Sequence, residues 1–263
     1  MANPEVYDVY AVRYAHSPPR PATENFMRSD AHDVDMPLDF FVWVIRNAQR
    51  TIVVDTGFTR ATAEIRGHHY LADIDHLLDE MSVDRAAVSD VIVTHMHWDH
   101  AGNFDLCPSS TLHLQEQEMH FVTGRDMENA FLRRPISADD VCAAVRLLHD
   151  GRLRCHRGEY QLAPGVTVTH VGGHTPGHQV VGVATRGGWL VLASDAAHYY
   201  ANMEQMNPFP VIYNVADNVR SWQTIAELAG GVENVVPGHD PLVMQRYPAL
   251  SGDLAEHVVR LSG

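Results

Sequence analysis

The chain has 263 residues, of which 45% are hydrophobic and 20% are charged. This composition fits an ordinary globular protein with a sizeable core and excludes a disordered or fibrous chain. Lys and Arg total 19 against 33 Asp and Glu, for a formal net charge of -14. We therefore expect neither nucleic acid nor an acidic membrane surface as a partner, because both would repel the protein.

The beginning of the chain lacks the basic and then apolar pattern of an export signal, and no apolar run approaches the roughly 20 residues of a membrane span. The three cysteines, Cys107, Cys142 and Cys155, form no CxxC pair. Unpaired thiols suit a reducing compartment, so we expect a cytoplasmic protein. The unusual number is 18 His, since histidine is mostly a residue of sites and surfaces.

Alternating or β-rich patterns along the chain predict strands at Val6–Tyr14, Phe40–Ile45, Thr51–Val54, Val91–Thr94, Val166–His170, Val180–Ala184 and Trp189–Ala193. Helical spacing predicts helices at Tyr70–Met81, Ala138–Leu148, Asn218–Leu228 and Asp253–Leu261. With no repeat and no flexible linker, we expect a single domain over residues 1–263, with two sheets covered by helices. An arginine-rich helical insertion at about 121–160 is a candidate lid or homodimer surface.

Four potential metal ligands follow the apolar run Val91–Thr94 within six residues: His95, His97, Asp99 and His100. Three imidazoles and a carboxylate this close would repel one another when protonated, and buried nitrogens would lack partners. A divalent cation relieves both problems. Imidazole and carboxylate without thiolate suit zinc, iron, manganese or cobalt.

Three later segments also place a potential ligand just beyond apolar residues. They contain His174 and His178 in Gly-His-Thr-Pro-Gly-His, Asp195 in Ala-Ser-Asp, and His239 in Pro-Gly-His-Asp. Each segment alone is a weak signal, because His or Asp at a strand end is often a cap or turn residue. In this order and together with the first motif, they indicate one metal centre.

These segments resemble the metallo-β-lactamase-fold hydrolases, whose HxHxDH signature stands here at residues 95–100. The resemblance covers about residues 40–240 and includes the strand and turn around Asp55. It implies an α/β protein with a four-layer αββα sandwich. It also implies two divalent cations per chain, with zinc expected and iron, manganese or cobalt as alternatives.

The family match further implies a place for each ligand around the two cations. His95, His97 and His174 would hold one cation, Asp99, His100 and His239 the other, and Asp195 would bridge them. Asp55 and His178 would stand behind these ligands, where Asp55 orients one of them.

Two cations close together lower the pKa of a bound water to about 7, so hydroxide is available at neutral pH and can attack a polarised carbonyl. Hydrolysis by metal-bound hydroxide is therefore the expected reaction. Asp99 would position the nucleophile or carry a proton. A separate group would then protonate the leaving oxygen.

Among the family's members, the chain is most similar to the N-acyl homoserine lactonase group, through its length, its ligand set and its late Gly-His-Asp. We therefore expect it to open an acyl homoserine lactone or a related cyclic ester or amide. Those lactonases place a Tyr three residues after the bridging Asp, where it contacts the lactone oxygen. Here that position is His198 and the next is Tyr199, so both are candidates for this role.

Apolar and aromatic residues near the motifs are candidates to line a pocket for an acyl chain or a flat ring. They are Trp98, Phe104, Met203, Met206, Phe209 and Tyr213. An arginine of the 121–160 segment that pointed into this pocket would favour a carboxylate-bearing substrate. Two alternatives stay open: a thioesterase or phosphodiesterase at the same metals, and a metal-binding protein without catalysis.

Overall fold

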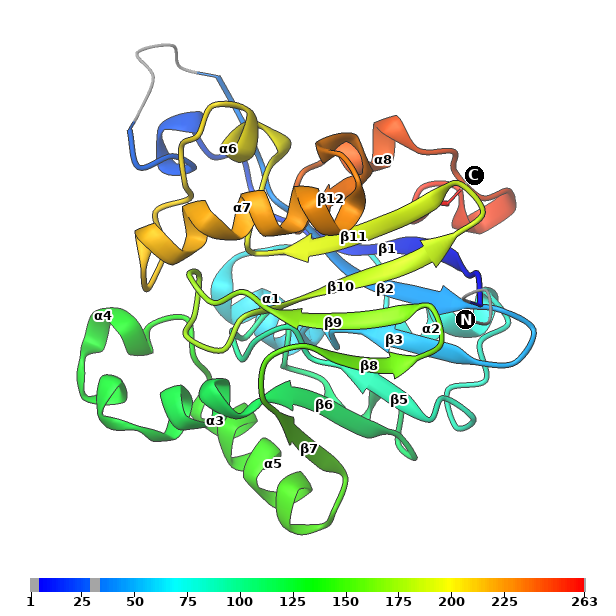
Figure 1. Cartoon of the computed structure of the whole chain (residues 1–263), viewed down its shortest axis with the longest axis horizontal. Coiled ribbons are helices and arrows are strands. Elements are labelled where there is room, and N and C mark those ends of the chain that lie inside the picture. The colour runs from blue at the N-terminus through cyan, green and yellow to red at the C-terminus, as the bar shows by residue number, and fades with distance from the viewer. Residues whose placement is uncertain (1–4, 29–33, 263) are drawn as a thin grey trace.

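The computed structural model describes residues 5–28 and 34–262 and contains two β-sheets that face each other (Figure 1). The larger sheet has the order β13-β1-β2-β3-β5-β6-β7, with β4 paired to β1. Its strands are β1 (Asp8–His16), β2 (Asp39–Arg46), β3 (Thr51–Val54), β4 (His69–Tyr70), β5 (Asp90–Ile92), β6 (Thr111–Gln115), β7 (Leu153–His156) and β13 (Val258–Arg260).

The smaller sheet has the order β12-β11-β10-β9-β8. Its strands are β8 (Tyr160–Ala163), β9 (Val166–His170), β10 (Gln179–Thr185), β11 (Gly188–Ser194) and β12 (Val235–Pro237). The α-helices are α1 (Arg60–Arg66), α2 (Ile74–Glu80), α3 (Glu116–Thr123), α4 (Ala130–Arg133), α5 (Ala138–His149), α6 (Tyr200–Glu204), α7 (Val215–Ala229) and α8 (Leu242–Arg246).

Three apolar clusters separate four layers. The central cluster joins the two sheets and includes Trp43 and Ile52 from the larger sheet and Val181 from the smaller one. A second cluster packs α1, α2, α3 and α5 on the outer face of the larger sheet. A third packs α7 on the outer face of the smaller sheet, where Trp222 is buried (Figure 1). This is the αββα sandwich that the family resemblance implied, and that prediction is confirmed.

The predicted helix at Asp253–Leu261 is wrong. This segment forms a short 3-10 turn at Gly252–Leu254 and then β13, which pairs antiparallel with β1. Val258 and Val259 are fully buried, and the edge of β1 offers them both hydrogen bonds and an apolar surface, which overrides the local helical spacing. The predicted helix at Tyr70–Met81 begins only at Ile74, because His69 and Tyr70 pair with β1.

The arginine-rich segment at 121–160 contributes more than helices. It holds α4 and α5, and it also supplies β7, the edge strand that runs parallel to β6. That this segment and the rest of the chain form a single domain stays a prediction. In the part of the chain that the structure describes, no helix is both long enough and apolar enough to cross a membrane.

The sheet topology brings the ligand-bearing segments to one edge of the sandwich. Strands β3, β5 and β6 run parallel, so the loops that follow β3 and β5 leave the larger sheet at the same edge. Strands β11 and β12 are also parallel, and the loops after them leave the smaller sheet together. Ligands and reacting groups in α/β proteins commonly lie at such carboxyl ends.

Candidate metal centre

The loop after β5 carries the first four predicted ligands. His95, His97 and His100 are buried, and the side chain of Asp99 keeps 12% of its surface exposed. The backbone of the loop is held from the far side of the site, since Trp98 N donates to Pro135 O at 3.0 Å. The loop therefore presents its imidazoles inward and leaves Asp99 at the open side.

Asp195 lies at the centre of the predicted ligands and presents each of its oxygens to a different set. Oδ2 lies 3.2 Å from His174 Nε2 and 3.8 Å from His95 Nε2. Oδ1 lies 3.2 Å from His100 Nε2 and 3.0 Å from His239 Nε2. One carboxylate thus faces two groups of imidazoles, the arrangement expected of a ligand shared by two cations.

The ligand atoms separate into the two groups that the sequence predicted. His95, His97, His174 and Asp195 offer atoms within 4.8 Å of one another, and so do Asp99, His100 and His239. A third such group contains Asp195, His198 and His239. The structure therefore brings all seven predicted ligands together and adds His198 to them.

Buried hydrogen bonds fix which nitrogen of two histidines faces the centre. His100 Nδ1 donates to Asp55 Oδ2 at 2.7 Å, and His239 Nδ1 donates to the carbonyl of Asp39 at 2.9 Å. With Nδ1 protonated, Nε2 of each ring carries the lone pair that a cation needs. Asp55 has a left-handed backbone with φ 60° directly after β3, a strained conformation that aims its carboxylate at His100.

Burial and neighbouring charges set the protonation of these groups. Burial lowers the pKa of His95 and His174 well below the usual range and that of His97 to about 4, so these rings are neutral. Burial also opposes the charged form of His100, but the carboxylates of Asp195, Asp99 and Asp55 together raise its pKa well above the usual range. In the absence of a cation, the centre therefore draws a proton to compensate its carboxylates.

Burial and neighbouring charges also act in opposite directions on the carboxyl group of Asp195. Burial would raise the pKa of its carboxyl, but the surrounding histidines, His198 and His239 foremost, hold that pKa well below the usual range. The ionised carboxylate is therefore the stable form at neutral pH.

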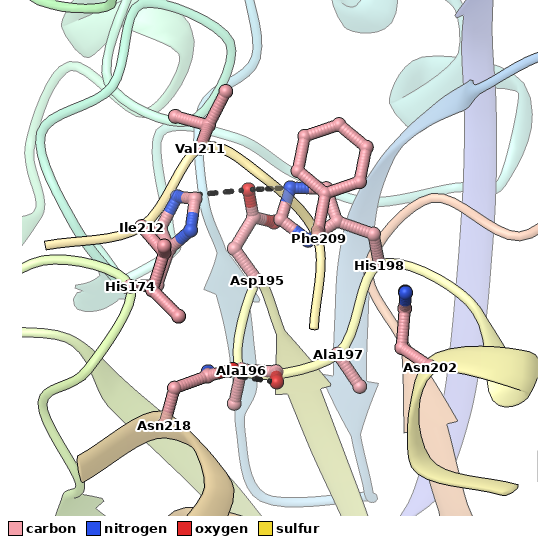
Figure 2. A pocket seen from close by; sticks show the side chains of 10 residues that line it. All are labelled: His174, Asp195, Ala196, Ala197, His198, Asn202, Phe209, Val211, Ile212 and Asn218. Atoms are coloured by element: carbon pink, nitrogen blue, oxygen red, sulfur yellow. Dashed lines mark hydrogen bonds and ion pairs between the residues drawn. The ribbon is translucent and has the colours of Figure 1, made fainter. Parts of the chain in front are cut away.

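The remaining predicted residues of the centre have different surroundings. His198 Nε2 lies 3.0 Å from Asp195 Oδ2, and its ring stacks on Phe209 with centroids 3.7 Å apart (Figure 2). His178 is fully buried against His95, and neither of its ring nitrogens has a hydrogen-bond partner in the described chain. The Tyr199 hydroxyl donates to the carbonyls of Met36 and Pro37, so the predicted role at the substrate would require it to leave these partners.

The predicted pocket residues divide into two sets. Phe209 lines the pocket beside Asp195 and His198 (Figure 2). Trp98 precedes Asp99 in the loop after β5. The structure places the others elsewhere: Phe104 and Met203 are buried in two different apolar clusters, Met206 is 56% exposed, and Tyr213 donates its hydroxyl hydrogen to Asp126. Val211 and Ile212, which the sequence did not single out, line the pocket as well.

The chain is similar to known proteins in both sequence and fold. Residues 39–110 match the model of the metallo-beta-lactamase superfamily. An N-acyl homoserine lactonase of a Bacillus species is 24% identical over 65% of this chain and 70% of its own length. A crystal structure of a quorum-quenching N-acyl homoserine lactone lactonase superposes with a TM-score of 0.73 at 18% identity, over 91% of this chain and 95% of that one. The chain therefore resembles the metallo-β-lactamase superfamily in the sequence of residues 39–110 and in its fold.

Other relatives widen the range of activities within this superfamily. An acyl-coenzyme A thioesterase, MBLAC2 of Bos taurus, is 26% identical over 75% of this chain and 72% of its own length. The structure of AidC, a dizinc quorum-quenching lactonase, superposes with a TM-score of 0.68 at 15% identity, over 97% of this chain and 93% of that one. Another lactonase, of Bacillus cereus, is matched over only 42% of its length. The predicted class of metal-dependent hydrolase is confirmed at the level of the superfamily.

Glu118 is a buried residue at the centre that the sequence did not single out. Its Oε1 accepts from Met96 N at 2.9 Å, between two of the predicted ligands. Its Oε2 accepts from Thr175 Oγ1 at 2.6 Å and from Gly177 N at 3.0 Å. One side chain of α3 therefore joins the loop after β5 to the loop between β9 and β10. No spacing in the sequence marks it, because its partners lie in distant segments.

Replacing Asp55 with Asn is expected to lower metal affinity by about 10- to 100-fold, the usual cost of losing a partner behind a ligand. The carboxylate accepts from His100, from Thr94 N at 2.7 Å and from Thr94 Oγ1 at 2.9 Å. An amide of the same shape must point its NH₂ at one of these donors. Competition with a chelator of known affinity measures the effect.

Asp90→Asn is the matched control for this substitution. Asp90 also accepts from a histidine, His113 Nε2 at 2.8 Å, but it lies at the opposite end of β5. We expect its metal affinity to equal that of the parent. Equal affinities for Asp55→Asn and Asp90→Asn would contradict the orienting role of Asp55.

Proposed function

We propose that this protein is a dinuclear metal-dependent hydrolase that opens a lactone ring. The observation that carries the proposal is the Asp195 carboxylate, whose oxygens face two separate groups of histidines. The similarity to lactonases over most of the fold supports the reaction class. The residues around the centre restrict which substrates can bind.

The residues fit a pair of divalent cations. His95 Nε2, His100 Nε2 and Asp195 Oδ1 are buried without a hydrogen-bond partner in the described chain. His97 Nδ1 and His174 Nε2 lie 2.9 Å apart, so one of them donates a proton to the other unless cations take both lone pairs. Such a set of orphaned nitrogens and one carboxylate is costly unless cations satisfy it.

His95, His97 and His174 would hold one cation, Asp99, His100 and His239 the other, with Asp195 shared. Bound there, the cations supply hydroxide at neutral pH and polarise the carbonyl under attack. Imidazole and carboxylate ligands are compatible with zinc, and the dizinc lactonase AidC is a structural neighbour. We therefore propose zinc as the metal.

Asp99 and His198 are the chain's own candidates for handling substrate and protons. Asp99 is the predicted ligand at the open side, and its Oδ2 lies 3.7 Å from His239 Nε2 and 3.8 Å from His100 Nε2. It can accept a hydrogen bond from the attacking oxygen. His198 Nδ1 has no hydrogen-bond partner in the described chain. The imidazole can donate to the alkoxide that leaves when the lactone opens if its proton sits on Nδ1 rather than on Nε2, which lies 3.0 Å from Asp195 Oδ2.

The pocket beside the centre is small. Asp195, His198, Phe209, Val211 and Ile212 line it (Figure 2), and no water-sized space lies between them. Small-molecule sites usually measure about 300–1,000 Å³, so we infer that a substrate approaches the centre from the open side at Asp99 rather than filling this hollow.

A chelation experiment combined with a substrate panel tests the proposal. We expect removal of metal to abolish opening of a simple γ-lactone and restoration of zinc to recover it. A chelated protein that keeps full turnover would exclude metal-dependent hydrolysis. The metal-loaded protein is then compared on a lactone, an acyl-coenzyme A thioester and an activated phosphodiester by kcat/KM.

The panel includes a thioester because one relative is an acyl-coenzyme A thioesterase. We expect the lactone to have the highest kcat/KM. A higher value for the thioester would transfer the proposal to that reaction, and no turnover with two metals bound would favour a metal-binding protein without catalysis. The cytoplasmic location and the homodimer stay predictions.

A further inference from the structure

An aromatic wall borders the open side of the metal centre. Trp98 stands between the predicted ligands His97 and Asp99, and its ring stacks on His68 with centroids 5.3 Å apart and planes 8° apart. Phe58 and Phe40 pack on the same two rings at centroid distances of 4.8 to 6.1 Å. Phe40 also contacts His239 at 5.3 Å. This wall is therefore continuous with the ligands.

Arg66 lies on this wall at the end of α1. Its guanidinium carbon is 4.1 Å from the centroid of the Trp98 ring. Asp99 and Asp140 exert their charges on Arg66, but neither forms an ion pair with it in the described chain. An arginine stacked on an aromatic ring holds its planar donors in a defined direction and loses little freedom on binding a carboxylate.

A second arginine stacks on a ring that lines the pocket. The guanidinium carbon of Arg20 is 5.4 Å from the centroid of Phe209, the ring that stacks on His198. Arg20 Nη2 donates to the carbonyl of Glu24 at 3.1 Å and lies 3.6 Å from its exposed carboxylate, a long contact that contributes little in water. Arg20 Nε is buried and has no hydrogen-bond partner within residues 5–28 and 34–262.

The two arginines flank the same centre. Arg66 stacks on Trp98, the neighbour of Asp99, and Arg20 stacks on Phe209, whose ring lies on His198. Burial is the main cause that lowers the pKa of His68, and the positive charges of both arginines lower it further, against the opposing charge of Asp99. His68 Nδ1 is buried and also lacks a partner in the described chain.

We propose that the substrate carries a carboxylate in addition to its scissile ester, and that Arg66 and Arg20 bind this carboxylate beside the Trp98–His68 wall. The inference rests on the proposed function and specifies its substrate class. In a protein of net charge -14, most of the surface repels an anion, and two arginines beside the metal ligands make this the place where an anionic substrate is attracted. A neutral acyl homoserine lactone uses neither charge.

The test compares two γ-butyrolactones that differ in one group, a ring carboxylate in one and the uncharged carboxamide in the other. We expect the parent to favour the carboxylate in kcat/KM by roughly tenfold or more, as a charged hydrogen-bonded pair provides. Arg66→Met and Arg20→Met should each reduce this ratio by several-fold. Added salt should reduce the parent's ratio as well, because the charges are partly exposed.

Arg220→Met is the matched control. Arg220 is exposed on α7 and pairs with Asp217 at 2.9 Å, away from the centre. Its carboxylate-to-carboxamide ratio should equal that of the parent. A parent that opens both lactones equally well, or ratios unchanged in both arginine variants, would overturn the inference and leave the lactonase proposal intact.

A binding measurement decides the inference even if no lactone is opened. Calorimetry with cyclopentanone carboxylate and its carboxamide, which have no ester to hydrolyse, reports affinity alone. We expect the carboxylate to bind more tightly to the parent and this preference to fall in Arg66→Met. Equal binding of the two ketones would contradict the inference, whereas failure of both lactones would contradict only the proposed function.

Discussion

Replacing Asp195 with Ala is expected to remove bound metal and to lower kcat/KM for lactone opening on the order of 10³-fold. Asp195 is the one side chain whose oxygens face both groups of histidines, at 3.0 to 3.8 Å. Charge stabilisation by bound metal is worth several kcal/mol, and about 1.4 kcal/mol corresponds to a tenfold change in rate. Metal per chain, by atomic emission, and steady-state kinetics measure the two effects.

Asp217→Ala is the matched control, because it removes a carboxylate from the exposed first turn of α7. It should keep the metal content and the kcat/KM of the parent. Circular dichroism of both variants shows that each is folded. A folded Asp195→Ala protein that keeps two metals and the parent rate would contradict the shared-ligand assignment.

The strands that the sequence predicted are those whose burial leaves a strong local signal. Phe40–Ile45 reads as a nearly continuous apolar run because β2 lies between two layers and is buried along almost its whole length. Val166–His170 and Thr51–Val54 have the predicted bounds as β9 and β3. The segment Asp253–Leu261 has only nine residues, too few to separate helical from strand periodicity, and its pairing with β1 makes it a strand.

The positions of the seven predicted ligands could be read from the sequence for a similar reason. Each follows a short apolar run, and the sequence around each contains a recognisable group of His, Asp and Gly residues. The structure explains this pattern, because the ends of β5, β11 and β12 and the loop after β9 meet at one edge. Local sequence therefore marks the ligands, although their convergence depends on the fold.

The residues that surround the ligands could not be found in the same way. Glu118, Arg20 and His68 each act across large sequence separations, and each is an ordinary residue in its own segment. The arginines beside the centre come from the N-terminal loop and α1, whereas the sequence drew attention to those of the 121–160 segment. Within that segment, Arg157 instead pairs with Glu116. Contacts of this kind depend on the tertiary arrangement.

Replacing Gly177 with Ala is expected to destabilise the fold by about 3 kcal/mol or more, the upper range for overpacking a tight site. A Cβ atom at Gly177 would lie 2.2 Å from Glu118 N and 2.6 Å from Glu118 Cα. These are backbone atoms, so a rotamer change cannot relieve the contact. The loop between β9 and β10 must move away from α3, which also breaks the hydrogen bond from Gly177 N to Glu118 Oε2.

The same displacement should weaken metal binding, because Glu118 also holds Met96 N between His95 and His97, and Gly177 lies next to His178 and near His174. Urea unfolding and metal titration measure both effects. Gly182→Ala is the matched control, since its Cβ would meet only ordinary contacts at 3.7 Å or longer within β10. Equal urea midpoints for the two variants would show that the loop accommodates a Cβ, and the brace through Glu118 would then contribute little to the metal centre.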